Sequence, residues 1–108
     1  MNYTMKLDLI TIERQMSKVE ALLASTSALL SERGQQYDSP TGERSMGRTV
    51  AAFNAITGRE LTEAEGMLLL AILKMVRDRQ RATPHQDSCE DLIAYSALYA
   101  EARLNEIE

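Results

Sequence analysis

The sequence has a single cysteine, Cys89, a single histidine, His85, and no tryptophan. One cysteine cannot form an internal disulfide, and one cysteine with one histidine cannot supply the four ligands of a structural zinc site. The sequence therefore predicts a protein of a reducing compartment without a disulfide framework.

Long hydrophobic runs are also missing. The longest stretch of apolar residues without a charge, residues 66–73, is far shorter than the roughly 18 residues of a membrane span. The first eight residues are polar, and no apolar run follows them, so we expect no signal peptide and no membrane association.

Positive charge is in deficit, because 12 lysines and arginines face 16 acids and the formal net charge is −4. A general nucleic-acid-binding protein usually carries a basic surface, so this function is not expected. The length of 108 residues and the 44% hydrophobic content predict one domain, residues 1–108, with a small core.

No stretch of the chain alternates polar and apolar residues with the period of two that strands require, so we expect no sheet. Apolar residues instead recur at helical spacing, which predicts an all-α, bundle-like domain of four helices. Their expected ranges are a long N-terminal helix at 7–33, helices at 43–57 and 62–81, and a fourth helix from 87 or 88, with 43–106 as the helical core. Glycine, proline and polar residues predict turns at 34–42, 58–61 and 82–86.

The helix expected at 7–33 carries a heptad seam. Its members follow one another in steps of three and four: Leu9, Ile12, Met16, Val19, Leu23, Thr26, Leu30 and Arg33. A seam of this kind is typical of helices that pair with a second copy, so we predict a homodimer with this helix in the interface. The alternative is that the helix packs only on its own domain. Gly34 is expected to end it.

The helix expected at 62–81 begins with the capping-box pattern of Thr62 and Glu65. Its middle has no polar face, which predicts that other helices surround it. For the next helix, Asp87 or Ser88 is the expected N-cap residue, with Glu90 or Asp91 completing a second box.

A group of bases and a group of acids meet where these two helices join. Because the break between them is short, the helices should be antiparallel neighbours. This places Lys74, Arg77 and Arg81 beside Asp87 and Asp91. One interpretation is a set of structural ion pairs. The other is a phosphate site formed by Lys74 and Arg77, with Asp87 and Asp91 holding a divalent ion such as Mg²⁺.

Two tyrosines near this corner are further candidates. Tyr37 lies in a polar segment, where an aromatic side chain either closes the edge of a core or stacks on a ligand base. Tyr95 follows Asp91 by one helical turn and is the other candidate for stacking. His85, in the break beside Pro84, is interpreted as a solvent-exposed residue rather than a catalytic base.

Several sequence blocks resemble a family of small helical proteins of unknown function, encoded by tailed phages and prophages. The blocks are Glu-Arg-Gly-x-x-Tyr from Glu32, Glu-Arg-Ser-Met from Glu43, Leu-Lys-x-x-Arg from Leu73 and Asp-x-x-Glu-Asp-x-x-x-Tyr from Asp87. The resemblance covers about residues 29–101 and implies a phage origin and a bacterial cytoplasm, but no established activity. Arg44, in the second block, joins the candidate ligand-binding residues.

A weaker likeness links the Lys-x-x-Arg block and the acidic helix start to phage nucleotide kinases that lack a P-loop. The helix count is also similar to that of all-α nucleotide pyrophosphatases of the MazG type, which hold magnesium with Glu-x-x-Glu and Glu-x-x-Asp. Glu60 and Glu63 match the first of these patterns, and Asp87, Glu90 and Asp91 match the second in part. These likenesses imply a nucleotide ligand.

The common catalytic motifs are absent, including the P-loop, Gly-x-Ser-x-Gly and Cys-x-x-Cys, so the sequence does not decide whether the protein is an enzyme. Two functions stay open. The first is a phage accessory protein that binds a nucleotide or another phosphate compound at the corner. The second is a non-enzymatic protein-binding module that inhibits or modulates a host or anti-phage defence protein.

Overall fold

The computed structural model describes residues 17–37 and 45–107, and for 34–37 it describes the backbone alone. Within these ranges the chain forms four helices and no strand, which confirms the all-α prediction. The helices are α2 (Lys18–Tyr37), α3 (Met46–Thr57), α4 (Glu63–Arg79) and α5 (Gln86–Asn105). None of the described helices is both long enough and apolar enough to cross a membrane.

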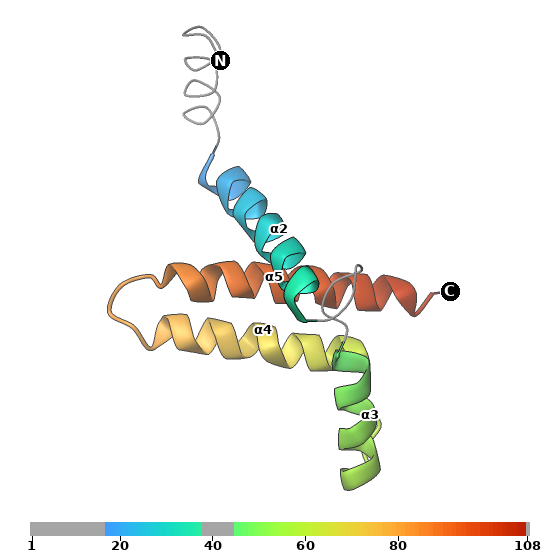
Figure 1. Cartoon of the computed structure of the whole chain (residues 1–108). Helices are drawn as coiled ribbons and strands as arrows, with labels where there is room; N and C mark the ends of the chain where they lie inside the picture. The colour runs from blue at the N-terminus through green and yellow to red at the C-terminus, as the bar shows by residue number, and fades with distance from the viewer. Residues whose placement is uncertain (1–16, 38–44, 108) are drawn as a thin grey trace, which may run out of the picture.

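The centre of the arrangement is an antiparallel hairpin of α4 and α5 (Figure 1). Helix α2 crosses in front of α5 in this view and, among the described helices, packs on α5 alone (Figure 1). Helix α3 projects from the beginning of α4, away from α5 (Figure 1). The short connection at residues 80–85 makes α4 and α5 neighbours, as the sequence predicts.

Small side chains line the contact between α4 and α5. Ala64 and Ala71 of α4 and Ala94 of α5 are buried, and Met67 is the one large apolar side chain of the hairpin in this class. Small residues allow two helix backbones to approach closely, but they remove little apolar area from water. Among the described residues no large side chain is fully buried, so the core of a single chain is thin.

The joint between α3 and α4 is built from residues that fix a tight turn. Gly58 ends α3 in the left-handed region, at φ 74°, as its position in the sequence predicts. The Asn54 side chain then holds Leu61, because its Nδ2 donates to the Leu61 carbonyl at 2.9 Å and its Oδ1 accepts from the Leu61 N–H at 2.8 Å. The predicted capping box of Thr62 and Glu65 is present and begins α4.

Helix α2 uses only part of the predicted seam against its own chain. Thr26 is buried and Leu30 is half-buried, whereas Val19 and Leu23 are exposed. The seam positions before residue 17 lie outside the described residues. The prediction that Gly34 ends the helix is wrong, because α2 continues to Tyr37. A glycine within a helix costs only about 1 kcal/mol, and the two glutamines that follow it favour the helix.

Two further predictions are corrected. Helix α5 is capped by His85 rather than by Asp87 or Ser88, so it begins at Gln86, two residues earlier than an Asp87 cap and three earlier than a Ser88 cap would allow. The prediction that other helices surround α4 is wrong for the described part of the chain. Only α5 and α3 pack against α4 there, and the outer apolar face of α4 is open to solvent. Leu69 on this face, for example, is 63% exposed. Hydrophobic spacing predicts that a helix face packs against another surface, but it does not predict that this surface belongs to the same chain.

Candidate functional site

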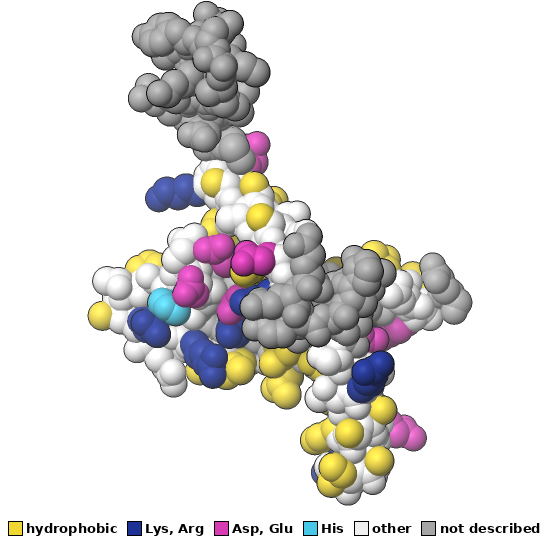
Figure 2. All heavy atoms as spheres, viewed as in Figure 1, with side chains coloured by type: hydrophobic (Ala, Val, Ile, Leu, Met, Phe, Trp, Pro, Cys, Tyr) yellow, Lys and Arg dark blue, Asp and Glu magenta, His cyan; other side chains and the backbone are white. Residues whose placement is uncertain are grey.

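A pocket of about 550 Å³ lies beside the connection between α4 and α5. Its lining comes from the end of α4, the connection and the first two turns of α5: Lys74, Arg77, Gln80, Arg81, His85, Asp87, Ser88 and Asp91. Figure 2 shows lysine and arginine side chains grouped on this face, next to the histidine. The four residues that the sequence places at this corner, Lys74, Arg77, Asp87 and Asp91, therefore line one pocket.

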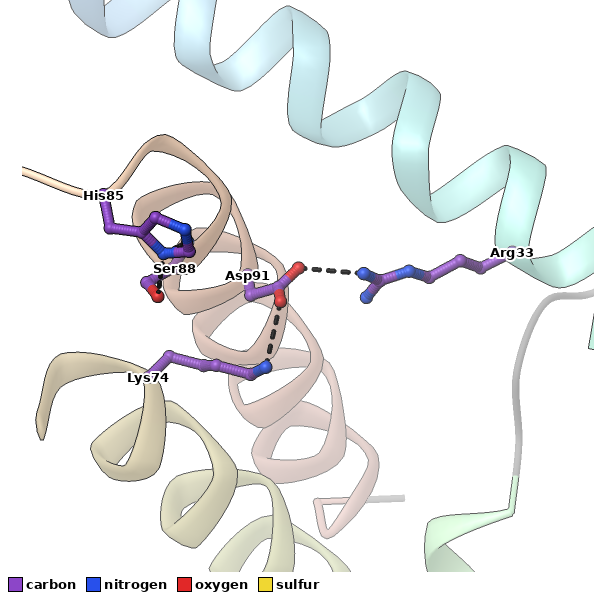
Figure 3. Close-up of polar contacts among 5 residues, drawn as sticks. All are labelled: Arg33, Lys74, His85, Ser88 and Asp91. Atoms are coloured by element: carbon purple, nitrogen blue, oxygen red, sulfur yellow. Dashed lines mark hydrogen bonds and ion pairs between the residues drawn. The ribbon is translucent and has the colours of Figure 1, made fainter. Parts of the chain in front are cut away.

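Asp91 connects three helices at the inner side of this pocket (Figure 3). Its Oδ1 accepts from Arg33 Nη2 of α2 at 2.9 Å, and its Oδ2 pairs with Lys74 Nζ of α4 at 3.0 Å. The Asp91 side chain is only 12% exposed, and those of Lys74 and Arg33 are 17% and 29% exposed. Because these ion pairs are largely shielded from water, removing one partner would leave the opposite charge without compensation.

Positive charge prevails in the rest of the pocket. Arg77 and Arg81 are exposed, and neither makes an ion pair among the described residues. The lining carries three cations, Lys74, Arg77 and Arg81, against two carboxylates, Asp87 and Asp91. With Asp91 neutralised by Lys74 and Arg33, the two arginines remain available to an anion, and a guanidinium can bind a carboxylate or phosphate through two parallel hydrogen bonds.

His85 has a structural role at the pocket wall. Its Nδ1 accepts the backbone N–H of Ser88 at 3.3 Å and lies 2.6 Å from Ser88 Oγ (Figure 3). Its own backbone N–H donates to Asp78 Oδ1 at 2.8 Å. A neutral ring whose Nδ1 is an acceptor carries its proton on Nε2. The interpretation of His85 as a solvent-exposed residue is therefore corrected: it is half-buried, it caps α5 and it lines the pocket.

Asp78 holds the connection between the two helices together. Besides accepting from His85, its Oδ1 lies 3.7 Å from Cys89 Sγ, which donates to it. Burial, and then the negative charge and hydrogen bond of Asp78, raise the pKa of the Cys89 thiol. The thiol is thus kept neutral, which makes it a packing residue rather than a reactive nucleophile.

The divalent-cation site expected at Asp87 and Asp91 stays a prediction, and the structure shows how Asp91 is already engaged. Asp87 and Asp91 line the same pocket, but both oxygens of Asp91 already face cations. Among the described residues no group of three or more acidic, histidine or cysteine side chains is placed to hold a metal ion. Asp91 therefore serves here to position Lys74 and Arg33, and the arrangement suits an anion better than a cation.

The remaining candidates lie elsewhere or outside the described part. Tyr95 lines a second, smaller pocket of about 250 Å³, between α3, α4 and α5. Arg44 and the side chain of Tyr37 lie outside the described residues. Glu60 and Glu63, at the start of α4, are exposed and do not line the corner pocket, so the MazG-type pattern is not brought to the cations.

Arg33 is the main residue that sequence reasoning left out of the site. Its position at the end of an otherwise apolar seam is the signal that could have found it, because a charged residue on a packed face requires a buried partner. Gln80 and Ser88 carried no such signal, since their place in the lining follows from the path of the connection.

Comparison with known families identifies the family of the chain. The family model described as "Domain of unknown function (DUF6378)" matches residues 20–103. The chain belongs to this family. The match begins in the first turn of α2 and ends in the last turn of α5, so the DUF6378 domain includes Arg33 and every residue that lines the corner pocket. No curated protein and no solved structure matches the chain.

Proposed function

We propose that this DUF6378 protein is a phage-encoded accessory protein of the bacterial cytoplasm that binds a nucleotide or another phosphate compound in the corner pocket. The observation that carries the proposal is the surplus of cations in this one pocket, in a chain whose net charge is −4. A local field of this sign in an acidic protein attracts anions to one place rather than to the surface as a whole.

Each cation has a distinct part in the proposal. Arg77 and Arg81 lie on the exposed rim and supply the guanidinium forks that contact phosphate oxygens. Lys74 is held in position by Asp91 and adds a point charge from within. The pocket volume of about 550 Å³ lies within the range of ordinary small-molecule sites.

A calorimetric titration tests this function. Nucleoside monophosphates, nucleoside triphosphates and inorganic phosphate are titrated with and without Mg²⁺ into the wild type, Arg77→Ala and Arg59→Ala. Arg59 is the matched control, because it is exposed in the turn before α4 and outside the pocket lining. We expect binding by the wild type and by the control, and an affinity about tenfold lower or worse for Arg77→Ala, the loss of roughly one charged hydrogen bond.

Two results would remove the proposal: no heat with any of these compounds, or equal affinity of the wild type and Arg77→Ala. The Mg²⁺ arm asks a separate question. If Mg²⁺ tightens the binding of triphosphates to the wild type but not to Asp87→Asn, then the exposed Asp87 carboxylate coordinates the ion together with a phosphate group of the ligand.

A second candidate is the protein-binding module that inhibits or modulates a host or defence protein. It is favoured by the exposure of Val19 (65%) and Leu23 (54%) on α2, and by the internal pairing of Asp91. Under this function the nucleotide titrations are silent. A host protein recovered on immobilised wild type, but not on the variant with Val19→Asp and Leu23→Asp, would support it.

A further inference from the structure

The outer face of α4 carries large apolar side chains that nothing in the described chain covers. Six residues of 38–63% exposure form it: Leu68, Leu69, Ile72, Leu73, Met75 and Val76. The buried residues Ala64, Met67 and Ala71 lie on the adjoining face of the helix, toward α5 and α3. Figure 2 shows hydrophobic side chains along the edge of α4 that faces away from α5.

The spacing on this face is that of a helix-packing surface. Leu68, Ile72 and Met75 follow one another in steps of four and three, and Leu69, Leu73 and Val76 do the same. Two adjacent rows of this kind form the stripe that packs against another helix. An exposed stripe of this length marks an interaction site rather than ordinary surface.

A charged residue lies at each end of the apolar stripe, an acid at one end and a base at the other, at equal distances from its centre. Glu65 lies seven residues before Ile72, and Arg79 lies seven residues after it. Seven residues make about two turns, so Glu65, Ile72 and Arg79 share one line along the helix. Both charged side chains are exposed, and neither makes an ion pair among the described residues.

We propose that a second copy of this chain covers the face, with the two α4 helices antiparallel and a two-fold axis at Ile72. In this register Ile72 meets its own copy, and Leu68 and Leu69 lie opposite Val76 and Met75 of the partner. Glu65 then lies opposite Arg79 of the partner at both ends, so one surface is complementary to itself in shape and in charge. Self-complementarity about an axis is what a symmetric dimer requires.

Helix α3 supports the same occupant. It projects from the beginning of α4 on the side away from α5, so it flanks the exposed face at one end (Figure 1). Its Phe53 and Ile56 are 44% and 85% exposed. The symmetry that pairs the α4 helices places α3 of each copy beside the far end of the partner's α4, which extends the contact toward the size that a stable dimer needs.

The capping box does not compete with this pairing. One carboxylate oxygen of Glu65, Oε1, accepts the backbone N–H of Thr62 at 3.0 Å. Its other oxygen makes no hydrogen bond among the described residues, and the guanidinium of a partner can reach it. The dimer is independent of phosphate binding, because neither Glu65 nor the apolar stripe lines the corner pocket.

Sedimentation or light scattering at micromolar concentrations tests the proposal on the full chain. We expect a two-chain mass for the wild type and for Leu104→Asp, the control at an exposed apolar position of α5 outside the stripe. Ile72→Asp brings two carboxylates together at the axis and should raise the dissociation constant at least about 100-fold. Circular dichroism checks that both variants remain helical.

A cross-link tests the register. In a Cys89→Ser background, Ile72→Cys should form a two-chain disulfide under mild oxidation, because the axis brings this position next to its own copy. Leu104→Cys in the same background should not. In a second arm, Arg79→Glu should weaken the dimer, since it places two acids opposite each other.

A single-chain mass for the wild type overturns the proposal. So does a dimer that is unaffected by Ile72→Asp but dissociated by Val19→Asp and Leu23→Asp, because the α2 seam would then be the interface. A disulfide that forms at Leu104→Cys as readily as at Ile72→Cys also refutes the register.

Discussion

The two faces of α4 differ in the size of their side chains and in their exposure to solvent. The face toward α5 is small and partly charged, with Ala64, Ala71 and the Lys74 ion pair, and it is buried. The face away from α5 is large and apolar, with residues such as Leu69 and Ile72, and it is exposed. The large apolar residues exposed on the outer face of this helix, unlike the buried Met67, contribute little to the core of a single chain, and the proposed dimer would give that face a contact of its own.

The strongest way to break the inner contact is to remove Asp91. Asp91→Ala leaves Lys74 and Arg33 without their shared partner in a shielded position, so we expect a loss of about 3 kcal/mol in the free energy of unfolding. Urea denaturation of wild type and variant measures it. The exposed Asp87→Ala is the control and should cost about 0.5 kcal/mol or less. Equal effects would mean that the Asp91 ion pairs contribute no stability.

Adding volume sharpens the comparison of the two faces. Ala71→Leu forces a large side chain between α4 and α5 and should destabilise the fold by about 2 kcal/mol. Leu68→Ala, on the outer face, opens no cavity within one chain, so most of its cost should vanish at protein concentrations where the chains are separate. Thermal unfolding at several concentrations distinguishes the two cases. A large, concentration-independent cost for Leu68→Ala would show that the outer face is covered by its own chain.

Helix α2 offers a substitution that should stabilise the domain. Thr26 is 3% exposed, and its hydroxyl makes no hydrogen bond among the described residues. Thr26→Val replaces an unsatisfied polar group by an apolar group of the same shape, so we expect a gain of about 1 kcal/mol. Thr49→Val is the matched control, since that hydroxyl is exposed and donates to the Ser45 carbonyl at 2.9 Å. A loss of stability in Thr26→Val would reveal a partner for the buried hydroxyl.

The smallest effect concerns the thiol beside the connection. Burial and Asp78 raise the pKa of Cys89 above its ordinary value, so the neutral thiol contributes stability that is fully present below the unfolded pKa of about 8.5 and is lost as the pH rises through the folded value. The alkylation rate of the folded protein should therefore reach its midpoint above that of a free thiol. Asp78→Asn keeps an acceptor but removes the charge, and it should lower the midpoint. An unchanged midpoint would leave burial as the sole cause.

Much of the fold follows from local chemistry. Thr62 and Glu65 predict the start of α4, and Gly58 predicts the end of α3. Both predictions succeed because a capping box and a positive φ depend only on residues within one helical turn. The cap by His85 and the passage of α2 through Gly34 did not follow, since several polar residues compete for a cap and a single glycine only weakens a helix.

The candidate site shows the same division. Antiparallel packing across a short connection brings Lys74, Arg77, Asp87 and Asp91 to one pocket, and this could be argued from spacing alone. The second partner of Asp91 could not, because Arg33 is 58 positions away and its approach depends on how α2 crosses α5. Without that crossing angle, the sequence left the acids equally suited to hold a metal ion.

By itself the sequence determined the helical class, the breaks between α3, α4 and α5, the caps at Gly58 and Thr62 and the grouping of charges at the corner, because each depends on residues near one another along the chain. Only the tertiary structure decided which charges are neutralised and which apolar face stays open. Helical periodicity specifies the direction of a face and not its occupant. On α4 one face meets α5 of the same chain, and the other, with Ile72 at its centre, meets nothing in the described chain.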